Sequence, residues 1–256
     1  MISNDVFEIV ESPNTNIVGC RWVLTNKIMP DGSVKPKARL VAQGSTQKEG
    51  LDYTTTFAPV AQVEAIRLLF ATAALLKLKI VQADIKTAFL NGDLKEMIFM
   101  EQPIGYQGGT NRVWRLKKSI YGLKQAPKAW YDKFSSVLRS LNLQSSTADN
   151  CIYYRTNPLL LLAIYVDDII LFSVEEKTIL DLITSLKLHF ELNIIESGKF
   201  LGFQYEQYLG GDIFIHQNAY INRILKRFDM EQSNSAQTPI VTGHNNKDSK
   251  PFEDNS

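Results

Sequence analysis

The sequence predicts an α+β fold built on an antiparallel sheet, and three observations lead to this prediction. Short runs of branched apolar residues alternate with amphipathic helical patterns, without the regular strand–helix–strand repeat of a parallel sheet. Several of these runs are joined by turns rich in Gly, Asn or Asp, which is typical of antiparallel hairpins. The chain has 256 residues, 45% of them hydrophobic, which is enough to bury one large core or two modest ones.

The N-terminal part of the chain predicts a polar segment followed by a hairpin. Residues 1–16 are polar, and we expect them to be loosely held. Residues 20–29 and 34–41 have strand character and flank the turn signal at residues 30–32, Pro-Asp-Gly.

One strand of this hairpin carries an alternating row of cations. Lys35, Lys37 and Arg39 are two residues apart, so their side chains lie on one face of a strand. Such a face binds an anion, or it protects an exposed edge strand from pairing with other chains. The residues alone leave both interpretations open.

The next part of the chain predicts a helix and a strand that ends in an acid. Residues 43–59 are rich in turn formers, and residues 64–77 have helical periodicity. Residues 79–85 form a predicted strand that carries Asp84 near its end. Phe89 follows in a turn.

A second hairpin and a long helix come next. Residues 97–100 and 112–117 pair around a Gly-rich loop, and residues 127–141 form an amphipathic helix with Trp130 in its buried stripe. Between positions 112 and 133, basic residues interleave with Trp and Tyr against a single acid, a composition that suits a phosphate backbone with bases to stack. The alternative is a core tryptophan beside a solvated face of lysines. We assign Trp130 to the core and favour phosphate binding for the lysines as a group.

The C-terminal half predicts further strands and two helices. The predicted strands are residues 151–155, 159–166, 169–172, 200–208 and 212–216, and the predicted helices are residues 175–190 and 220–228. From residue 232 onward the chain is polar and has neither strand nor helix periodicity, which indicates a disordered or truncated tail.

Asp167 and Asp168 stand between two apolar runs, which is an unusual place for adjacent carboxylates. Like charges repel by several kcal/mol at an effective dielectric constant of about 20, and burial adds a desolvation penalty. A divalent metal ion is the simplest compensation, because Mg²⁺ accepts one or two carboxylates together with substrate phosphates. The alternative is a surface turn, since Asp favours turns, but the flanks are too apolar for an ordinary exposed turn.

Composition excludes several other classes of function. A net charge of +1 gives no overall preference for nucleic acid, and two cysteines are too few for a disulfide framework, which fits a reducing compartment. The three histidines form no cluster with metal-ligand spacing. The sequence contains no GxxxxGK phosphate loop, no GxSxG turn and no signal peptide or other targeting signal.

The acids at two strand ends suggest a shared site. If the strand that ends at Asp84 lies beside the strands around Asp167 and Asp168, three carboxylates converge. Two metal ions about 3.5–4 Å apart could then activate an attacking hydroxyl and stabilise a leaving pyrophosphate. Adjacent strand residues point to opposite faces, so we expect Asp167 to face Asp84 and Asp168 to be more peripheral.

Seven stretches of the sequence carry a resemblance, and in order they are RWVLTNKIMPDGSVKPKARLVAQG, LDYTTTFAPV, IRLLFATAA, QADIKTAFLNGDL, SIYGLKQAPKAWYDKF, YVDD and KFLGFQY. In this order they resemble the reverse transcriptase domain of the Pol polyprotein of copia-type long-terminal-repeat retrotransposons, and the resemblance covers roughly residues 18–240. YVDD alone is a weak signal, whereas seven collinear stretches are a specific one.

The resemblance implies a right-hand polymerase of fingers, a palm with the antiparallel sheet and a partial thumb. The implied reverse transcriptase domain is residues 17–242. Its fingers are residues 17–78, its palm with a returning fingers segment is residues 79–208, and its thumb begins at residues 209–231. Residues 1–16 and 243–256 are the polar N-terminal segment and the tail.

The resemblance also implies a role for each matching residue. Asp84, Asp167 and Asp168 are the implied catalytic and metal-binding acids. Phe89 matches the aromatic that blocks a ribose 2′-hydroxyl, and Gln125 matches a residue that lines the incoming nucleotide. The implied triphosphate-binding cations are Arg39 and Lys37, and the implied primer-gripping segment is Phe200, Leu201 and Gly202.

The implied activity is RNA-directed DNA synthesis with two Mg²⁺ ions, or Mn²⁺ in their place. The implied partners are an RNA or DNA template with its primer, deoxynucleoside triphosphates, and the integrase and ribonuclease H regions of a longer polyprotein. The implied locations are cytoplasmic virus-like particles and the nucleus, with no membrane. Two alternatives are a catalytically inactive nucleic-acid-binding remnant and a general metal-dependent phosphotransferase.

One stretch departs from the family. Residues 192–196 read LNIIE where the family usually has a lysine-containing segment, so Asn193 stands at a common lysine position. A proton-donating role at this position does not carry over to Asn193.

Overall fold

A computed structural model describes residues 1–28, 32–108, 111–196 and 198–235 of the chain. These residues contain four α-helices, each at a position where the sequence predicts one. They are α1 (Val63–Leu75), α2 (Ala126–Ser140), α3 (Glu176–Lys187) and α4 (Asn218–Arg227). Three short 3₁₀ helices are η1 (Ile2–Asn4), η2 (Gly44–Thr46) and η3 (Ala88–Asn91).

The centre of the molecule is a six-stranded sheet with the strand order β12-β5-β11-β10-β9-β8. Its strands are β5 (Lys79–Ile85), β8 (Gln144–Ser145), β9 (Ile152–Thr156), β10 (Leu159–Tyr165), β11 (Asp168–Ser173) and β12 (Leu192–Ile195). Every neighbouring pair is antiparallel, which confirms the predicted antiparallel sheet.

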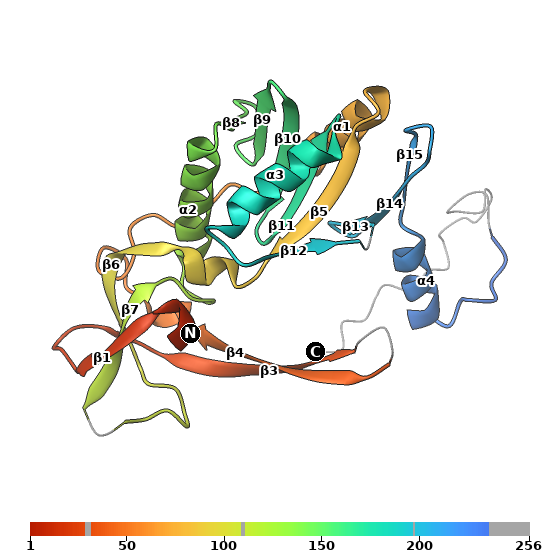
Figure 1. Cartoon of the computed structure of the whole chain (residues 1–256). Coiled ribbons are helices and arrows are strands. Elements are labelled where there is room, and N and C mark those ends of the chain that lie inside the picture. The colour runs from red at the N-terminus through yellow and green to blue at the C-terminus, as the bar shows by residue number, and fades with distance from the viewer. Residues whose placement is uncertain (29–31, 109–110, 197, 236–256) are drawn as a thin grey trace, which may run out of the picture.

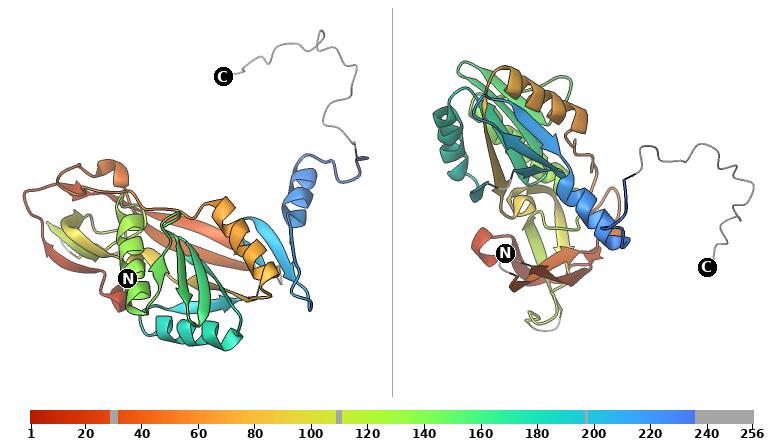
Figure 2. Two further views of the ribbon diagram at one scale, coloured as in Figure 1. Left: turned by 90° about the horizontal axis from the view of Figure 1, so that it is seen from above. Right: turned by 90° about the vertical axis from the view of Figure 1, so that its right-hand side faces the viewer.

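Helices cover both faces of this sheet, which explains the nearly unbroken apolar sequence of β10 and β11. α1 and α3 lie on opposite faces (Figures 1 and 2). Phe70 of α1 packs edge-on against Phe172 of β11, with ring centroids 5.4 Å apart. On the other side, Trp130 of α2 meets Phe190, just after α3, at 5.2 Å. These contacts belong to a first hydrophobic core.

A four-stranded sheet, with the order β1-β7-β6-β2, contributes to a second hydrophobic core. Its strands are β1 (Phe7–Glu11), β2 (Ile17–Val18), β6 (Asp93–Met100) and β7 (Arg112–Lys118). Two smaller units are the hairpin of β3 (Cys20–Ile28) and β4 (Val34–Ala42), and the three-stranded sheet of β13 (Lys199–Phe200), β14 (Phe203–Gln207) and β15 (Ile213–His216).

The expectation that residues 1–16 are loosely held is wrong. β1 pairs with β7 along its whole length, from Phe7 opposite Leu116 to Glu11 opposite Arg112. Val6 is fully buried in the second core. The partner strand β7 lies about 100 residues away in the sequence, so no local turn pattern could predict this pairing.

Two predictions lie outside the described residues. They are the turn at Pro30 and Asp31 and the tail at residues 243–256.

Among the described residues, no helix combines the length and the apolar character needed to span a membrane.

Candidate active site

The turn between β10 and β11 brings the acid pair to the end of the central sheet. Tyr165 and Asp168 are the last paired residues of the hairpin, and Val166 and Asp167 form its turn. Val166 has a φ of 58°, in the left-handed region that β-branched residues rarely adopt.

Asp84 lies next to this turn because β5 pairs directly with β11. Asp168 is opposite Asp84 in the register, and directly opposite residues of an antiparallel pair project from the same face. On its other side, Asp84 is opposite Asn193 of β12. The structure therefore aligns Asn193, Asp84 and Asp168 in one row across three strands.

Asp84 and Asp167 line one cavity of about 370 Å³, which we call the carboxylate cavity. Asp168 is not among the residues that line it. The lining residues are Met1, Lys37, Ala38, Arg39, Leu40, Asp84, Ile85, Lys86, Thr87, Leu90, Tyr121 and Asp167. The cavity thus joins the end of β5, the turn after β10 and the cationic face of β4.

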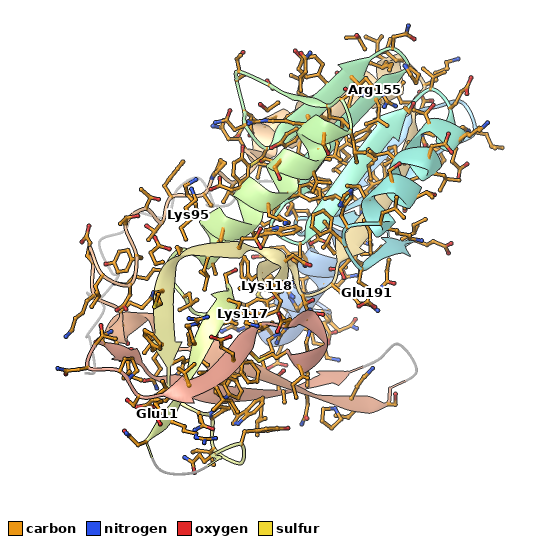
Figure 3. All side chains as sticks on the ribbon, turned by 60° about the vertical axis from the view of Figure 1, so that its left-hand side comes forward. Glu11, Lys95, Lys117, Lys118, Arg155 and Glu191 are labelled. Carbon is orange, nitrogen blue, oxygen red and sulfur yellow. The ribbon has the colours of Figure 1, made fainter. Side chains whose placement is uncertain are left out.

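The carboxylate cavity contains charges of both signs. The Arg39 guanidinium lies over the Tyr121 ring, 6.0 Å from its centroid. Lys86 forms an ion pair with Glu191, a residue labelled in Figure 3. Lys37 is exposed at the cavity edge. Both predicted nucleotide-binding cations, Lys37 and Arg39, therefore line the same cavity as two of the three predicted acids.

Burial and mutual repulsion shift the ionisation of this cluster. Burial raises the pKa of Asp168, and the negative charges of Asp167 and Asp84 raise it further, while a hydrogen bond from Gln82 opposes the shift. Burial also raises the pKa of Tyr121, with Asp167 and Asp84 adding to the effect and Arg39 opposing it.

Gln82 is a site neighbour that the sequence pattern did not reveal. Its side chain is 4% exposed, on the same face of β5 as Asp84, and its amide donates a hydrogen bond to Asp168. The carbonyl oxygen of the same amide is buried and meets no partner among the described residues. A glutamine in the middle of an apolar strand is thus explained by the carboxylate it contacts.

The donor set fits a hard divalent cation. Carboxylate oxygens are the ligands that Mg²⁺ prefers, and Mg²⁺ commonly takes only one or two of them with water and phosphate completing the shell. Asp84 and Asp167 could supply those oxygens from the cavity wall. In the described part of the chain no three His, Cys, Asp or Glu side chains surround a common point closely enough to hold an ion by themselves.

Phe89 does not line the carboxylate cavity, but its ring contacts Tyr121, which does. The two rings meet edge-on, with centroids 4.7 Å apart. Phe89 itself lines a separate apolar cavity of about 360 Å³, together with Trp130 and Val166. A second ring, Tyr121, therefore stands between Phe89 and the acids, and the sequence pattern did not single out this tyrosine as a site residue.

Gln125 does not line the carboxylate cavity. It is 4% exposed, accepts a hydrogen bond from Gln47 at 3.0 Å and donates one to the Asp52 carbonyl at 2.6 Å. It lines a third cavity, of about 260 Å³, beside Glu96 and Lys128. The structure does not bring Gln125 together with Asp84.

The predicted primer-gripping segment lies at the tight turn between β13 and β14. Phe200 is 1% exposed and belongs to the first core. Leu201 and Gly202 both have positive φ, 49° and 87°. None of the three lines the carboxylate cavity.

Four of the seven basic residues between positions 112 and 133 form ion pairs with acids, which changes the interpretation of this stretch. Arg115 meets Glu8 at 2.5 Å, and Lys117, labelled in Figure 3, meets Asp5 at 3.0 Å. Lys128 and Lys133 lie 2.8 Å and 2.9 Å from their acidic partners, Asp132 and Asp93. The prediction of a phosphate-binding group of lysines missed these partners, because most of them lie far away in the sequence.

Comparison with known proteins is consistent with this geometry. The family model described as reverse transcriptase (RNA-dependent DNA polymerase) matches residues 4–242. The retrovirus-related Pol polyprotein from transposon TNT 1-94 of Nicotiana tabacum is 36% identical over 252 residues, which is 94% of this chain and 19% of the relative. The Pol polyproteins from transposons RE1 and RE2 of Arabidopsis thaliana are 34% and 35% identical over 94% of this chain and 17% of each relative. The chain therefore spans about a fifth or less of the length of these relatives.

Proposed function

Because the chain belongs to the reverse transcriptase (RNA-dependent DNA polymerase) family, we propose that it is the polymerase segment of a copia-type retrotransposon Pol polyprotein. It extends the 3′-hydroxyl of a primer on an RNA or DNA template, using deoxynucleoside triphosphates. The observation that carries this proposal is the carboxylate cavity, where Asp84 and Asp167 share one space with Lys37 and Arg39.

The proposed layout is that of a right hand. The fingers are residues 17–78, the palm with a returning fingers segment is residues 79–208, and the thumb begins at residues 209–231. The six-stranded sheet would be the floor of the palm, and the β3–β4 hairpin would be the part of the fingers that faces it.

Asp84, Asp167 and Asp168 are the proposed acids of the reaction. When bound, two Mg²⁺ or Mn²⁺ ions lower the pKa of the primer hydroxyl and neutralise charge on the leaving pyrophosphate. Asp84 and Asp167 would bind the metal ions from the wall of the carboxylate cavity. Asp168 would supply negative charge from β11, the strand that neighbours β5. Asp168 lies directly opposite Asp84 in the register but does not line the carboxylate cavity, and for the latter reason it is proposed as the more peripheral acid.

Lys37 and Arg39 are proposed to bind the triphosphate. Charge-assisted hydrogen bonds to phosphate are strong, and the planar Arg guanidinium can grip two oxygens at once. Both side chains come from β4, so they reach the nucleotide from the side opposite the acids. Catalysis then depends mainly on positioning and on charge stabilisation, as in other phosphoryl transfers.

Phe89 is proposed to select deoxyribose, acting together with Tyr121. The edge-on contact between the two rings would support Tyr121 against the sugar and leave no room for a 2′-oxygen. Gln125 is proposed to line the nucleotide after exchanging its bonds to Gln47 and Asp52. Residues 200–202 are proposed to grip the primer.

The proposed partners are a primed template and the integrase and ribonuclease H regions of a longer polyprotein. The proposed locations are a cytoplasmic virus-like particle and the nucleus.

A primer-extension assay on the purified chain tests the proposal. With an RNA template, a DNA primer and Mg²⁺, we expect extension that falls at least about a thousandfold in Asp84→Asn and Asp167→Asn, because charge stabilisation is usually the largest catalytic contribution. Asp181→Asn, at an exposed position on α3, is the matched control and should retain activity. Tight binding of primed template without extension by the wild-type chain would instead identify an inactive nucleic-acid-binding remnant.

A further inference from the structure

The turn that carries Asp167 is held in a conformation it would not adopt unaided. Val166 has a φ of 58°, and a β-branched residue in this region is a genuine outlier. Such conformations persist only where the surrounding structure holds them.

Two hydrogen bonds hold this turn, one from α2 and one from β5. The Trp130 indole N–H donates to the Val166 carbonyl oxygen at 2.6 Å. The Ile85 amide N–H donates to the Asp167 carbonyl oxygen at 2.8 Å. The bond from Ile85 joins two backbone groups, whereas the bond from Trp130 depends on a single side chain.

Trp130 is a rigid donor. It is 2% exposed, and its ring lies 5.2 Å from Phe134 on the same helix and 5.2 Å from Phe190 beyond α3. Because packing fixes the indole, the direction of its N–H is fixed as well. The Val166 carbonyl oxygen is therefore hydrogen-bonded to a side chain that is fixed in the first hydrophobic core.

We propose that Trp130 is a positioning residue, whose indole N–H fixes the Val166–Asp167 turn and so places the Asp167 carboxylate beside Asp84. The proposal rests on the proposed function to the extent that Asp167 belongs to the active site. It adds to the packing role that the sequence predicts for Trp130, since a phenyl ring could fill much of the same space but could not hold the turn.

The chain contains a matched control in Trp114. This tryptophan is 4% exposed and stacks on Phe7, with ring centroids 3.6 Å apart. Its indole nitrogen is buried and has no hydrogen-bond partner among the described residues. Trp130→Phe and Trp114→Phe thus remove the same atoms from two buried sites, but only Trp130→Phe removes a hydrogen bond.

Amide hydrogen exchange followed by NMR provides a readout that does not depend on activity. In Trp130→Phe we expect the Ile85 amide to exchange about tenfold faster or more, because a looser turn breaks the Ile85–Asp167 bond more often. Trp114→Phe should leave this amide unchanged. Equal Ile85 exchange in the two variants would overturn the proposal.

Kinetics complete the test. We expect Trp130→Phe to lower the kcat of primer extension about tenfold while the Kd for primed template stays constant, because a small misplacement of a catalytic group costs rate and not binding. If Trp130→Phe fails to fold, Trp130→3-benzothienylalanine keeps the ring shape without the N–H and should give the same result. A normal kcat in either folded variant would contradict the positioning role. A wild-type chain without polymerase activity would contradict the proposed function, while the exchange comparison would still test the turn.

Discussion

Asp168 is the residue for which folding and function make opposite demands. Its carboxylate is partly buried and lies opposite Asp84, and burial and the neighbouring charges raise its pKa above the ordinary 3.8. A carboxyl with a raised pKa in the folded state contributes stability below its unfolded pKa, and this contribution is lost as the pH rises through the folded value. At neutral pH the charged form therefore weakens the fold.

Asp168→Asn should make the chain more stable at neutral pH in the absence of divalent cations. We expect a gain of up to about 1 kcal/mol in the free energy of unfolding, since the group is partly solvated and the repulsion is screened. The gain should disappear at acidic pH, where Asp168 is protonated in both states. Thermal unfolding across this pH range measures it, with Asp181→Asn as the control. A variant that is less stable than the wild type at neutral pH would show that the Gln82 bond outweighs the repulsion.

Phe89→Val tests sugar selectivity. If the Phe89 ring supports Tyr121 against the nucleotide, its loss should raise the incorporation of ribonucleotides relative to deoxyribonucleotides by about tenfold or more. If Phe89 is only a core aromatic, its truncation should lower stability and both rates together. Phe7→Val, at a partly buried ring in the second core, controls for general loosening. An unchanged ratio of the two rates in a folded, active variant would count against selection by Phe89.

At the scale of residues, the sequence predicts what depends on local order and misses what depends on distant partners. Asp84 and the acid pair could be predicted because each follows an apolar strand. The burial of Gln125 could not, because its partners Gln47 and Asp52 lie 78 and 73 residues away. The donor role of Trp130 was hidden for a similar reason, since its acceptor is a backbone oxygen that has no sequence signature.

In the β3–β4 hairpin, only some of the cations on one face of β4 line the carboxylate cavity. On β4, Lys35, Lys37 and Arg39 lie on one face, and Pro36 and Ala38 lie on the other. Lys37 and Arg39 line the carboxylate cavity, but Lys35, nearer the turn, does not. Position along the hairpin, and not charge alone, therefore determines which cation could meet a nucleotide.

Arg39→Ala should raise the KM for deoxynucleoside triphosphates by roughly 10- to 100-fold, since a hydrogen bond to a charged group contributes about 1.5–3 kcal/mol. Lys35→Ala removes a charge from the same face and should leave this KM within about twofold. Steady-state primer extension at varied nucleotide concentration distinguishes the two. Equal effects of the two variants would indicate general electrostatic attraction in place of a specific triphosphate contact.

At the scale of elements, prediction succeeds for helices, for hairpins and for the apolar strand β5, and it misses β1 and β12. The four α-helices and the β3–β4 hairpin have periodicity or a turn that can be detected in a short window. β1 and β12 join their sheets next to strands that are remote in sequence, and β12 is only four residues long. Register across such pairs is fixed by the assembled sheet, which a local pattern does not contain.

At the scale of the whole molecule, the attraction of nucleic acid depends on where the cations lie and not on the net charge. The net charge of +1 is too small to attract nucleic acid, so any attraction must come from cations whose charge is not already neutralised. On α2, Lys128 and Lys133 each form an ion pair. On α4, which has no buried residue and lies next to β14, Arg223 and Lys226 form no ion pair with another described residue.

Two double variants that lower the net charge equally should therefore differ in nucleic-acid binding. Each phosphate contact contributes about 0.7–0.9 to the slope of log K against log salt concentration. If α4 contacts the duplex as the start of a thumb, Arg223→Ala with Lys226→Ala should reduce that slope by about 1–2. Lys128→Ala with Lys133→Ala should reduce it by much less, because Asp132 and Asp93 already neutralise those ammonium groups. Fluorescence anisotropy of a labelled primed template over a salt series measures both slopes. If the α2 variant gives the larger change, the duplex lies across α2, the exposed ion pairs open on binding, and the original assignment of phosphate contacts to positions 112–133 is restored.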